Sequence, residues 1–241
     1  MVLVVFPLFS GNMLNGLVRG VIGLSFASVL YPHVAAALPP QGLPMWAWGA
    51  ILAKESFIGL LIGFVASLFF WAIQNVGSLI DFQTGASSAT VFDPISGHEG
   101  GPSAGFLAQL AAVLFVAGGG LTILLGVIYS SYQVWPIFSY FPKIGVALEL
   151  LMLREADSLM TMTVKLAAPV ILVLLVAELG LGLVNRFVPQ LNVFMLAMPI
   201  KAALAILILI VMLSFLNDAL REFFVGDRAI MQLLRGVLEP P

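Results

Sequence analysis

Long stretches without a single charged residue dominate this sequence. Ser56–Ile80 and Gly100–Pro142 contain no Asp, Glu, Lys or Arg. A helix that crosses the roughly 30 Å hydrocarbon core of a bilayer needs about 20 apolar residues, and both stretches exceed that length. Neither shows the alternation of apolar and polar residues that is typical of outer-membrane barrels. The sequence therefore predicts an all-α protein of the membrane type.

The overall composition excludes several functional classes. Charged residues make up 9% of the chain, against about 25% in a typical soluble domain, so they cannot cover a soluble surface of this size. The formal net charge is −2, which argues against a nucleic-acid partner. The chain has no cysteine and 2 histidines, so disulfides, thiolate sites and histidine metal centres are not expected. We expect no cofactor.

Five apolar segments are long enough, or nearly long enough, to cross a bilayer as helices. They are Val21–Leu38, Ser56–Ile80, Ala104–Tyr129, Leu159–Val184 and Val193–Leu216.

Glycine and proline mark special points within these segments. Gly118-Gly-Gly120 predicts a break or a very close contact, since glycine costs about 1 kcal/mol in a helix interior relative to alanine. Gly59 and Gly63 form a GxxxG pattern that permits close backbone approach. Pro169 predicts a kink.

Aromatic residues cluster after the third of these segments. Tyr129, Tyr132 and Trp135 lie within a few residues of one another and precede Pro136. Tyrosine and tryptophan are enriched where a membrane meets water. This pattern predicts that these side chains lie at the headgroup level.

The segment from Asp93 to Gly105 has a very different composition. It is rich in glycine and proline and joins two of the most apolar parts of the chain. This composition predicts non-helical backbone throughout the segment. It is either a solvated connector between two helices, or backbone inserted into a water-filled cavity, where irregular structure is tolerated at membrane depth.

The last third of the sequence places charges inside apolar helices. Lys165, Glu178, Arg186 and Lys201 each lie in or at the end of such a segment, at a cost of about 2.5–3.5 kcal/mol at a bilayer centre. Lys201 either reaches the headgroups or pairs with another protein group.

Glu178 invites two interpretations. It can share a helical face with Asn185 and Arg186 and make a structural polar contact. It can also serve as a proton-relay carboxylate.

The C-terminal part, residues 215–241, has another pattern. Phe215, Leu216, Leu220 and Phe223 belong to one apolar stripe, and polar residues occupy the opposite face. This predicts an amphipathic helix that docks on a partner or lies at the membrane surface. The sequence has no Ser-His-Asp set, metal cluster or nucleotide-binding motif. The pattern therefore favours a protein that is not an enzyme.

Three strings together resemble a known family. They are Asp81-Phe-Gln-Thr-Gly-Ala with Val91-Phe-Asp-Pro94, then Asn185-Arg-Phe-Val-Pro-Gln-Leu-Asn192, then Pro199-Ile-Lys201. They resemble the FliR/SpaR/YscT family, the export-gate subunits of type III secretion systems. The string Ser131-Tyr-Gln-Val-Trp-Pro136 is more similar to the injectisome (SctT-like) branch than to the flagellar one.

The resemblance implies one helical export-apparatus domain over residues 1–241, built from kinked helical hairpins. It implies a non-enzymatic subunit of the channel through which unfolded proteins cross the bacterial inner membrane, within the secretion-system basal body. The implied partners are P-type (SctR/FliP-like) and Q-type (SctS/FliQ-like) subunits, the switch protein (SctU/FlhB-like), secreted substrates and membrane lipid. No nucleic acid and no cofactor are implied.

The resemblance also assigns candidate residues. A plug loop maps onto the Gly/Pro-rich segment, namely Phe92, Asp93, Pro94, Ile95, Ser96, Gly97, His98, Glu99, Gly100, Gly101, Pro102, Ser103 and Gly105. Buried polar or inter-subunit contacts are expected from Lys165, Glu178, Asn185, Arg186, Gln190 and Lys201.

Two other functions compete with this interpretation. A secondary transporter or ion-coupled carrier would use Lys165, Glu178 and Lys201 to bind or relay ions. A purely structural scaffold would use the Asp93–Gly105 segment only as a connector. The transporter interpretation predicts an internal inverted repeat, which the sequence does not show.

Overall fold

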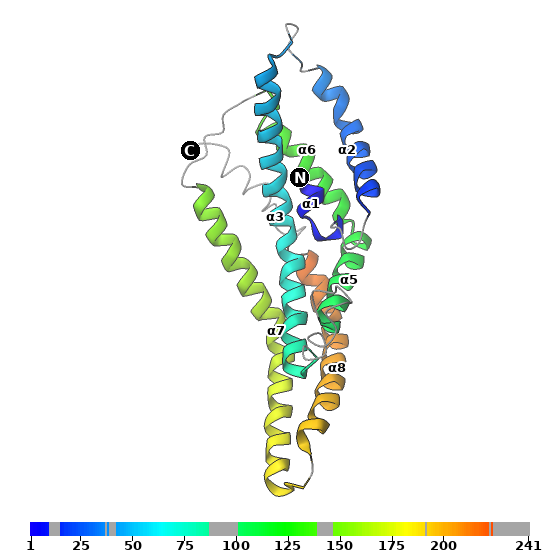
Figure 1. Ribbon diagram of the computed structural model, residues 1–241, viewed down its shortest axis with the longest axis vertical. Coiled ribbons are helices and arrows are strands. Elements are labelled where there is room, and N and C mark those ends of the chain that lie inside the picture. Colours follow the sequence, from blue (N-terminus) through cyan, green and yellow to red (C-terminus); the bar gives the residue numbers. More distant parts are fainter. Residues whose placement is uncertain are drawn as a thin grey trace. The chain divides into compact units, whose positions relative to one another are not determined.

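A computed structural model describes residues 1–9, 15–36, 38, 42–86, 101–138, 147–190, 192–221 and 223. This part of the chain contains helices and their connections and no strand (Figure 1). The prediction of an all-α protein is therefore confirmed. The helices are α1 (Val2–Val5), the 3-10 helix η1 (Pro7–Phe9), α2 (Gly16–Ala36), α3 (Met45–Thr84), α5 (Pro102–Ala117), α6 (Gly120–Val134), α7 (Ala147–Phe187) and α8 (Val193–Arg221).

Several helices have the length and composition of membrane spans. Met45–Thr84, Leu153–Phe187 and Met195–Leu220 qualify singly, with mean hydropathies of 2.3, 2.4 and 2.6. Helices α5 and α6 are long and apolar enough only when they are taken together, on either side of a break. Gly119, with φ of 77°, lies between them in the left-handed region, which glycine adopts without steric cost. The predicted break at Gly118–Gly120 is confirmed.

The chain folds into two compact units. Among the described residues, the first comprises those within Met1–Leu68 and Gly119–Ala156, and the second comprises those within Phe69–Gly118 and Asp157–Phe223. Helices α3 and α7 contribute residues to both units. The prediction of a single export-apparatus domain concerns function and stays a prediction.

In the first unit, the N-terminal residues pack against α3. A Cβ atom at Gly59 would lie 3.2 Å from the Met1 Cβ atom, and one at Gly63 would lie 3.2 Å from the Val2 Cα atom. The Ser67 hydroxyl donates a hydrogen bond to the Val5 carbonyl at 3.3 Å. The close approach predicted for the GxxxG pattern is confirmed, and its partner is α1.

The core of the second unit lies between α3 and α5. The rings of Phe70 and Phe115 meet edge to face, with centroids 5.4 Å apart, a favourable geometry for aromatic pairs. Ile73, Ile80 and Ala111 are fully buried beside them. This core fixes the position of the C-terminal turns of α3.

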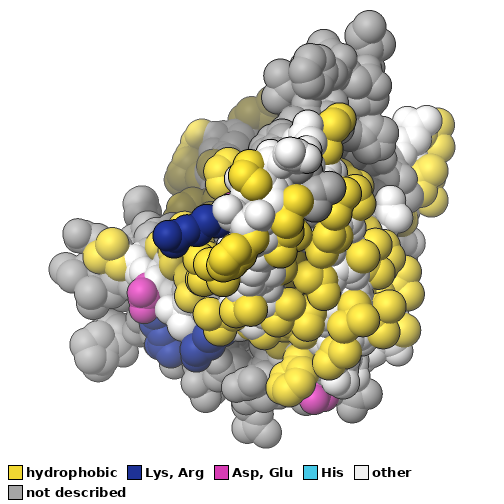
Figure 2. Space-filling model, turned by 90° about the horizontal axis from the view of Figure 1, so that it is seen from below, with side chains coloured by type: hydrophobic (Ala, Val, Ile, Leu, Met, Phe, Trp, Pro, Cys, Tyr) yellow, Lys and Arg dark blue, Asp and Glu magenta, His cyan; other side chains and the backbone are white. Residues whose placement is uncertain are grey.

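Helices α7 and α8 leave most of their apolar surface uncovered. In their most apolar windows, 17% of the residues are buried in α7 and 6% in α8. Figure 2 looks at the end where α7 turns into α8, and apolar side chains dominate the described surface there. Apolar patches of this extent mark contact with lipid or protein.

Two of the sequence predictions concern residues near the ends of helices. Trp135 is buried within the protein, with 5% of its surface exposed, and its level relative to the headgroups stays a prediction. Residues 215–221 continue α8, with Leu216 and Leu220 buried and Phe215 exposed. The rest of the predicted C-terminal helix lies outside the described residues, except Phe223.

Candidate functional site

The site is built where α3 ends and α5 begins, on either side of residues 87–100. The carboxylate of Asp81 accepts hydrogen bonds from the backbone N–H groups of Ser103 and Ala104, each at 3.0 Å. Asp81 is 1% exposed. These donors belong to the first turn of α5, where backbone N–H groups lack intrahelical partners and the helix dipole favours an anion.

The position of Asp81 within its own helix makes this role specific. It lies one turn before the end of α3, where the dipole of α3 disfavours a carboxylate. The first turn of α5 compensates for that unfavourable location. Asp81 therefore holds α5 against α3 at a point that is more than 20 residues away in sequence.

The predicted non-helical segment ends earlier than the sequence suggested. Gly101 is the N-cap residue, and Pro102, Ser103 and Gly105 lie inside α5. The prediction of non-helical backbone up to Gly105 is therefore wrong at its end. Proline is well suited to the first helical position, because its missing N–H would be unpaired there anyway, and Asp81 satisfies the next two donors.

Gly77 allows α5 to approach α3 at this point. A Cβ atom at Gly77 would lie 2.6 Å from the Ala104 nitrogen and 2.8 Å from the Ser103 carbonyl oxygen. Gly77 precedes Asp81 by about one helical turn, so both lie on the same face of α3. Gly77 provides the space for the close approach, and Asp81 provides the hydrogen bonds.

Lys201 contacts the C-terminal end of α3, just before residues 87–100. Its ammonium lies 3.1 Å from the Glu178 carboxylate and donates a hydrogen bond to the Gln83 carbonyl at 3.3 Å. The Lys201 side chain is 12% exposed and that of Glu178 is 55% exposed. A cation is favourable at the C-terminal end of α3. Of the two interpretations of Lys201, the structure supports the protein partner.

The two edges lie close together along α3. Gln83, which Lys201 binds, and Asp81, which binds α5, belong to its last turn. The chain therefore leaves α3 after Thr84 and enters α5 at Pro102 beside the same turn. Gly85, with φ of 80°, lies in the left-handed region and allows the turn that ends α3.

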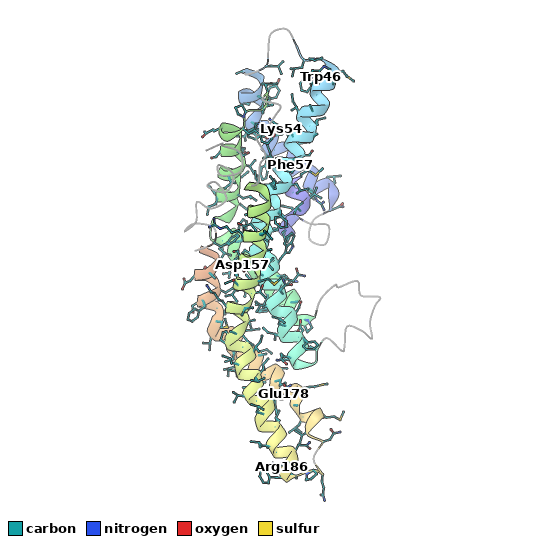
Figure 3. All side chains as sticks on the ribbon, turned by 90° about the vertical axis from the view of Figure 1, so that its left-hand side faces the viewer. Trp46, Lys54, Phe57, Asp157, Glu178 and Arg186 are labelled. Carbon is teal, nitrogen blue, oxygen red and sulfur yellow. The ribbon has the colours of Figure 1, made fainter. Side chains whose placement is uncertain are left out.

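Other predicted polar residues are not brought together. Lys165, Asn185, Arg186 and Gln190 are exposed in the isolated chain. Arg186 lies eight residues beyond Glu178, which corresponds to about 12 Å along a helix axis. Figure 3 labels both residues on α7. The Glu178 partner is Lys201 instead. The Lys201 side chain is largely covered, at 12% exposed, and the role of these six residues in buried or inter-subunit contacts stays a prediction.

Residues 92–100 of the predicted plug loop lie outside the described residues. Of that set, the structure places Gly101, Pro102, Ser103 and Gly105, all at the start of α5. The described part of the chain contains no group of three or more His, Cys, Asp or Glu residues that could hold a metal ion.

Sequence reasoning assigned no role to Lys54 in the first unit. Its ammonium donates hydrogen bonds to the carbonyls of Pro136 and Ile137, both at 2.8 Å. It also lies 3.0 Å from the Glu55 carboxylate and 5.3 Å from the centre of the Trp135 ring. The Lys54 side chain is 4% exposed. The sequence signal that could have indicated this role is the adjacent charge pair Lys54-Glu55 within an apolar helix.

Comparison with known proteins places the chain in a family. The family described as Bacterial export proteins, family 1, matches residues 1–226. The chain belongs to this family. Its similarity to Yop proteins translocation protein T of Yersinia pestis is 36% identity over 209 residues, which cover 86% of this chain and 80% of that protein.

Two further relatives in this family match shorter stretches of the chain. Surface presentation of antigens protein SpaR of Shigella flexneri is 38% identical over 178 residues, covering 73% of this chain and 68% of that protein. Flagellar biosynthetic protein FliR of Bacillus subtilis is 33% identical over 172 residues, covering 71% and 66%. The family resemblance is thus confirmed, and the relatives are proteins of the type III export apparatus. Together with the apolar helices, this indicates a membrane-embedded component of a secretion apparatus.

Proposed function

We propose that this chain is a core, non-enzymatic subunit of a type III export gate in the bacterial inner membrane. In this proposal it joins P-type and Q-type subunits, contacts the switch protein, and helps to form the channel for unfolded secreted proteins. We favour the injectisome branch on the string Ser131–Pro136. The proposal rests on family membership and on the uncovered surfaces of α7 and α8.

Those surfaces are better suited to protein partners than to lipid alone. The exposed apolar residues of α7 share the helix with the exposed polar groups of Lys165, Asn185 and Arg186. A charged side chain facing hydrocarbon costs about 2.5–3.5 kcal/mol near the bilayer centre. Neighbouring subunits can supply both apolar area and polar partners for such a face.

The ion-coupled alternative receives less support from the geometry. Glu178 and Lys201 neutralise each other at 3.1 Å, and the Lys201 ammonium also binds the end of α3. A relay carboxylate needs a proton path, whereas this pair serves to hold three helices. We therefore favour the structural role.

Co-purification tests the proposed assembly. A tagged full-length chain, expressed with the P-type and Q-type subunits of its own organism, is expected to retain both in mild detergent. Expressed alone, it is expected to aggregate or be degraded, because α7 and α8 remain uncovered. Size-exclusion chromatography and mass spectrometry measure both outcomes. A monodisperse monomer that melts cooperatively in detergent would contradict the proposal.

We further propose that the segment around residues 92–100 acts as the channel plug. The support comes from its described edges, which Asp81 and Lys201 fix to the same turn of α3. A segment with fixed ends and many glycines can be displaced by a substrate while its base stays in place. A simple helix–helix connection typically needs only 2–8 residues.

A deletion tests the plug without disturbing its base. Removing residues 95–100, and keeping Gly101, is expected to preserve assembly but to make the membrane permeable to ions and small solutes. The control replaces the same residues by six glycine and serine residues, which restores length but not side chains. Solute uptake is measured in cells that carry the whole apparatus. Normal assembly with an unchanged permeability barrier would return this segment to a connector.

A further inference from the structure

Helix α2 of the first unit carries a single charge. Arg19 is the one charged residue among residues 1–53 of the sequence, and α2 contains no other Asp, Glu, Lys or Arg. The backbone N–H of Arg19 donates a hydrogen bond to the Asn15 carbonyl at 3.1 Å. Arg19 therefore lies in the first turns of α2, at the end where the helix dipole disfavours a cation.

The guanidinium of Arg19 lacks a counter-charge within the described residues. No acidic side chain of that part of the chain forms an ion pair with it. Its Nε atom is shielded from solvent and has no hydrogen-bond partner there. Such atoms are rare in folded proteins, because nothing replaces the hydration that burial removes. The two terminal nitrogens are not shielded in the same way, so an anion from another chain can reach them.

The outer surface of α2 beside Arg19 is apolar and uncovered. Leu17, Val21 and Leu24 are 74%, 57% and 72% exposed. A helix that is apolar on all sides is normally buried in protein or in a membrane. The apolar part, Gly16–Pro32, is about 25 Å long as a helix, which is less than the roughly 30 Å of a hydrocarbon core. This surface therefore needs an apolar cover that also supplies a negative charge.

Two glycines near Arg19 favour protein over lipid as that cover. A Cβ atom at Gly16 or at Gly20 would have no atom within 4 Å, so no contact within the first unit requires glycine at either position. Gly20 lies inside α2, where glycine is less stable than alanine, and lipid gains nothing from its presence. A neighbouring helix does gain, because small residues let two backbones approach closely. Such an approach brings side chains of the neighbouring helix to Arg19.

We propose that the Arg19 guanidinium pairs with an Asp or Glu carboxylate on a helix of a neighbouring subunit. Arginine binds a carboxylate through two parallel hydrogen bonds, and the negative charge also interacts favourably with the N-terminal end of α2. The proposal rests on the proposed assembly with other export-gate subunits. It adds α2 to the interfaces of α7 and α8, and it specifies the charge that the partner provides.

Cross-linking identifies the partner carboxylate. The Arg19→Lys variant of the full chain is purified with its subunits and treated with a water-soluble carbodiimide, which activates carboxylates. The amine at position 19 attacks an activated carboxylate in contact with it, an amide bond forms, and a urea that carries one carboxylate oxygen leaves. Mass spectrometry is expected to find position 19 joined to an Asp or Glu of a partner subunit. The unaltered chain is the control, because a guanidinium does not form this amide.

Removing the charge tests whether the pair supports assembly. Arg19→Leu should reduce the co-purified amount of the cross-linked subunit at least about tenfold, because truncating one member of a hydrogen-bonded charge pair weakens an interface by that much or more. Arg19→Lys should retain it. Ser28→Leu is the matched control, since Ser28 is also exposed and lies nine residues further, on the opposite side of α2. Arg19→Glu, combined with a lysine in place of the cross-linked acid, should restore co-purification.

Three results would overturn the assignment of Arg19. The first is a cross-link from position 19 only to acidic residues of this chain. The second is the absence of a cross-link in a complex that assembles normally, and the third is equal co-purification of Arg19→Leu and Ser28→Leu. The proposed assembly is judged separately, by whether the unaltered chain retains the P-type and Q-type subunits.

Discussion

Replacing Gly77 by alanine is expected to force α5 away from α3. The new Cβ atom would lie 2.6 Å from the Ala104 nitrogen and 2.8 Å from the Ser103 carbonyl oxygen. Both are backbone atoms and cannot turn aside as a flexible side chain can. Overpacking of this kind costs about 1–3 kcal/mol, and occasionally more. Here it also pulls Ser103 and Ala104 away from Asp81, so we expect the upper end of that range.

The measurement is the amount of the Gly77→Ala chain that accumulates in membranes and assembles with its partners. A loss of about 3 kcal/mol corresponds to more than a hundredfold change in a folding equilibrium, so a large decrease is expected. Gly49→Ala is the matched control, because it lies in the same helix with nothing within 4 Å of its added Cβ atom. Equal accumulation of the two variants would show that α3 and α5 do not pack as described.

The sequence predicted the features that depend on neighbouring residues. Apolar runs identified the long helices, and three consecutive glycines identified the break between α5 and α6. The GxxxG pattern at Gly59 and Gly63 correctly indicated a close approach, although its partner α1 could not be inferred. In each case the physical cause is a pattern among residues that are close to one another in the sequence.

The features that sequence reasoning missed depend on contacts between distant residues. Asp81 reads as the last charged residue of an apolar helix, and its role appears only when Ser103 and Ala104 are folded beside it. That same contact starts α5 at Pro102, where composition alone predicted irregular backbone. The contact between Lys54 and the Trp135 ring likewise joins residues that are far apart in sequence.

Lys54→Met is expected to destabilise the first unit strongly. The ammonium of Lys54 satisfies the carbonyls of Pro136 and Ile137 and pairs with the Glu55 carboxylate, which also accepts a hydrogen bond from the Tyr132 side chain. Removing one member of a buried ion pair leaves the other uncompensated, at about 3–5 kcal/mol, and we expect the lower end of that range because the Glu55 side chain is 25% exposed. In a domain of this size that loss lowers the melting temperature by roughly 10 °C.

A double-mutant cycle separates the lost charge balance from the lost packing. Lys54→Met with Glu55→Gln removes both charges and should recover part of the stability of Lys54→Met alone, because partners in one network are not additive. Lys54→Arg retains the cation but has a bulkier head, and it should melt between Lys54→Met and the unaltered chain. Melting is followed in the purified complex by fluorescence. If Lys54→Met melted like the unaltered chain, the carbonyls of Pro136 and Ile137, which follow α6, would need no cation, and the hydrogen bonds from Lys54 would contribute nothing to stability.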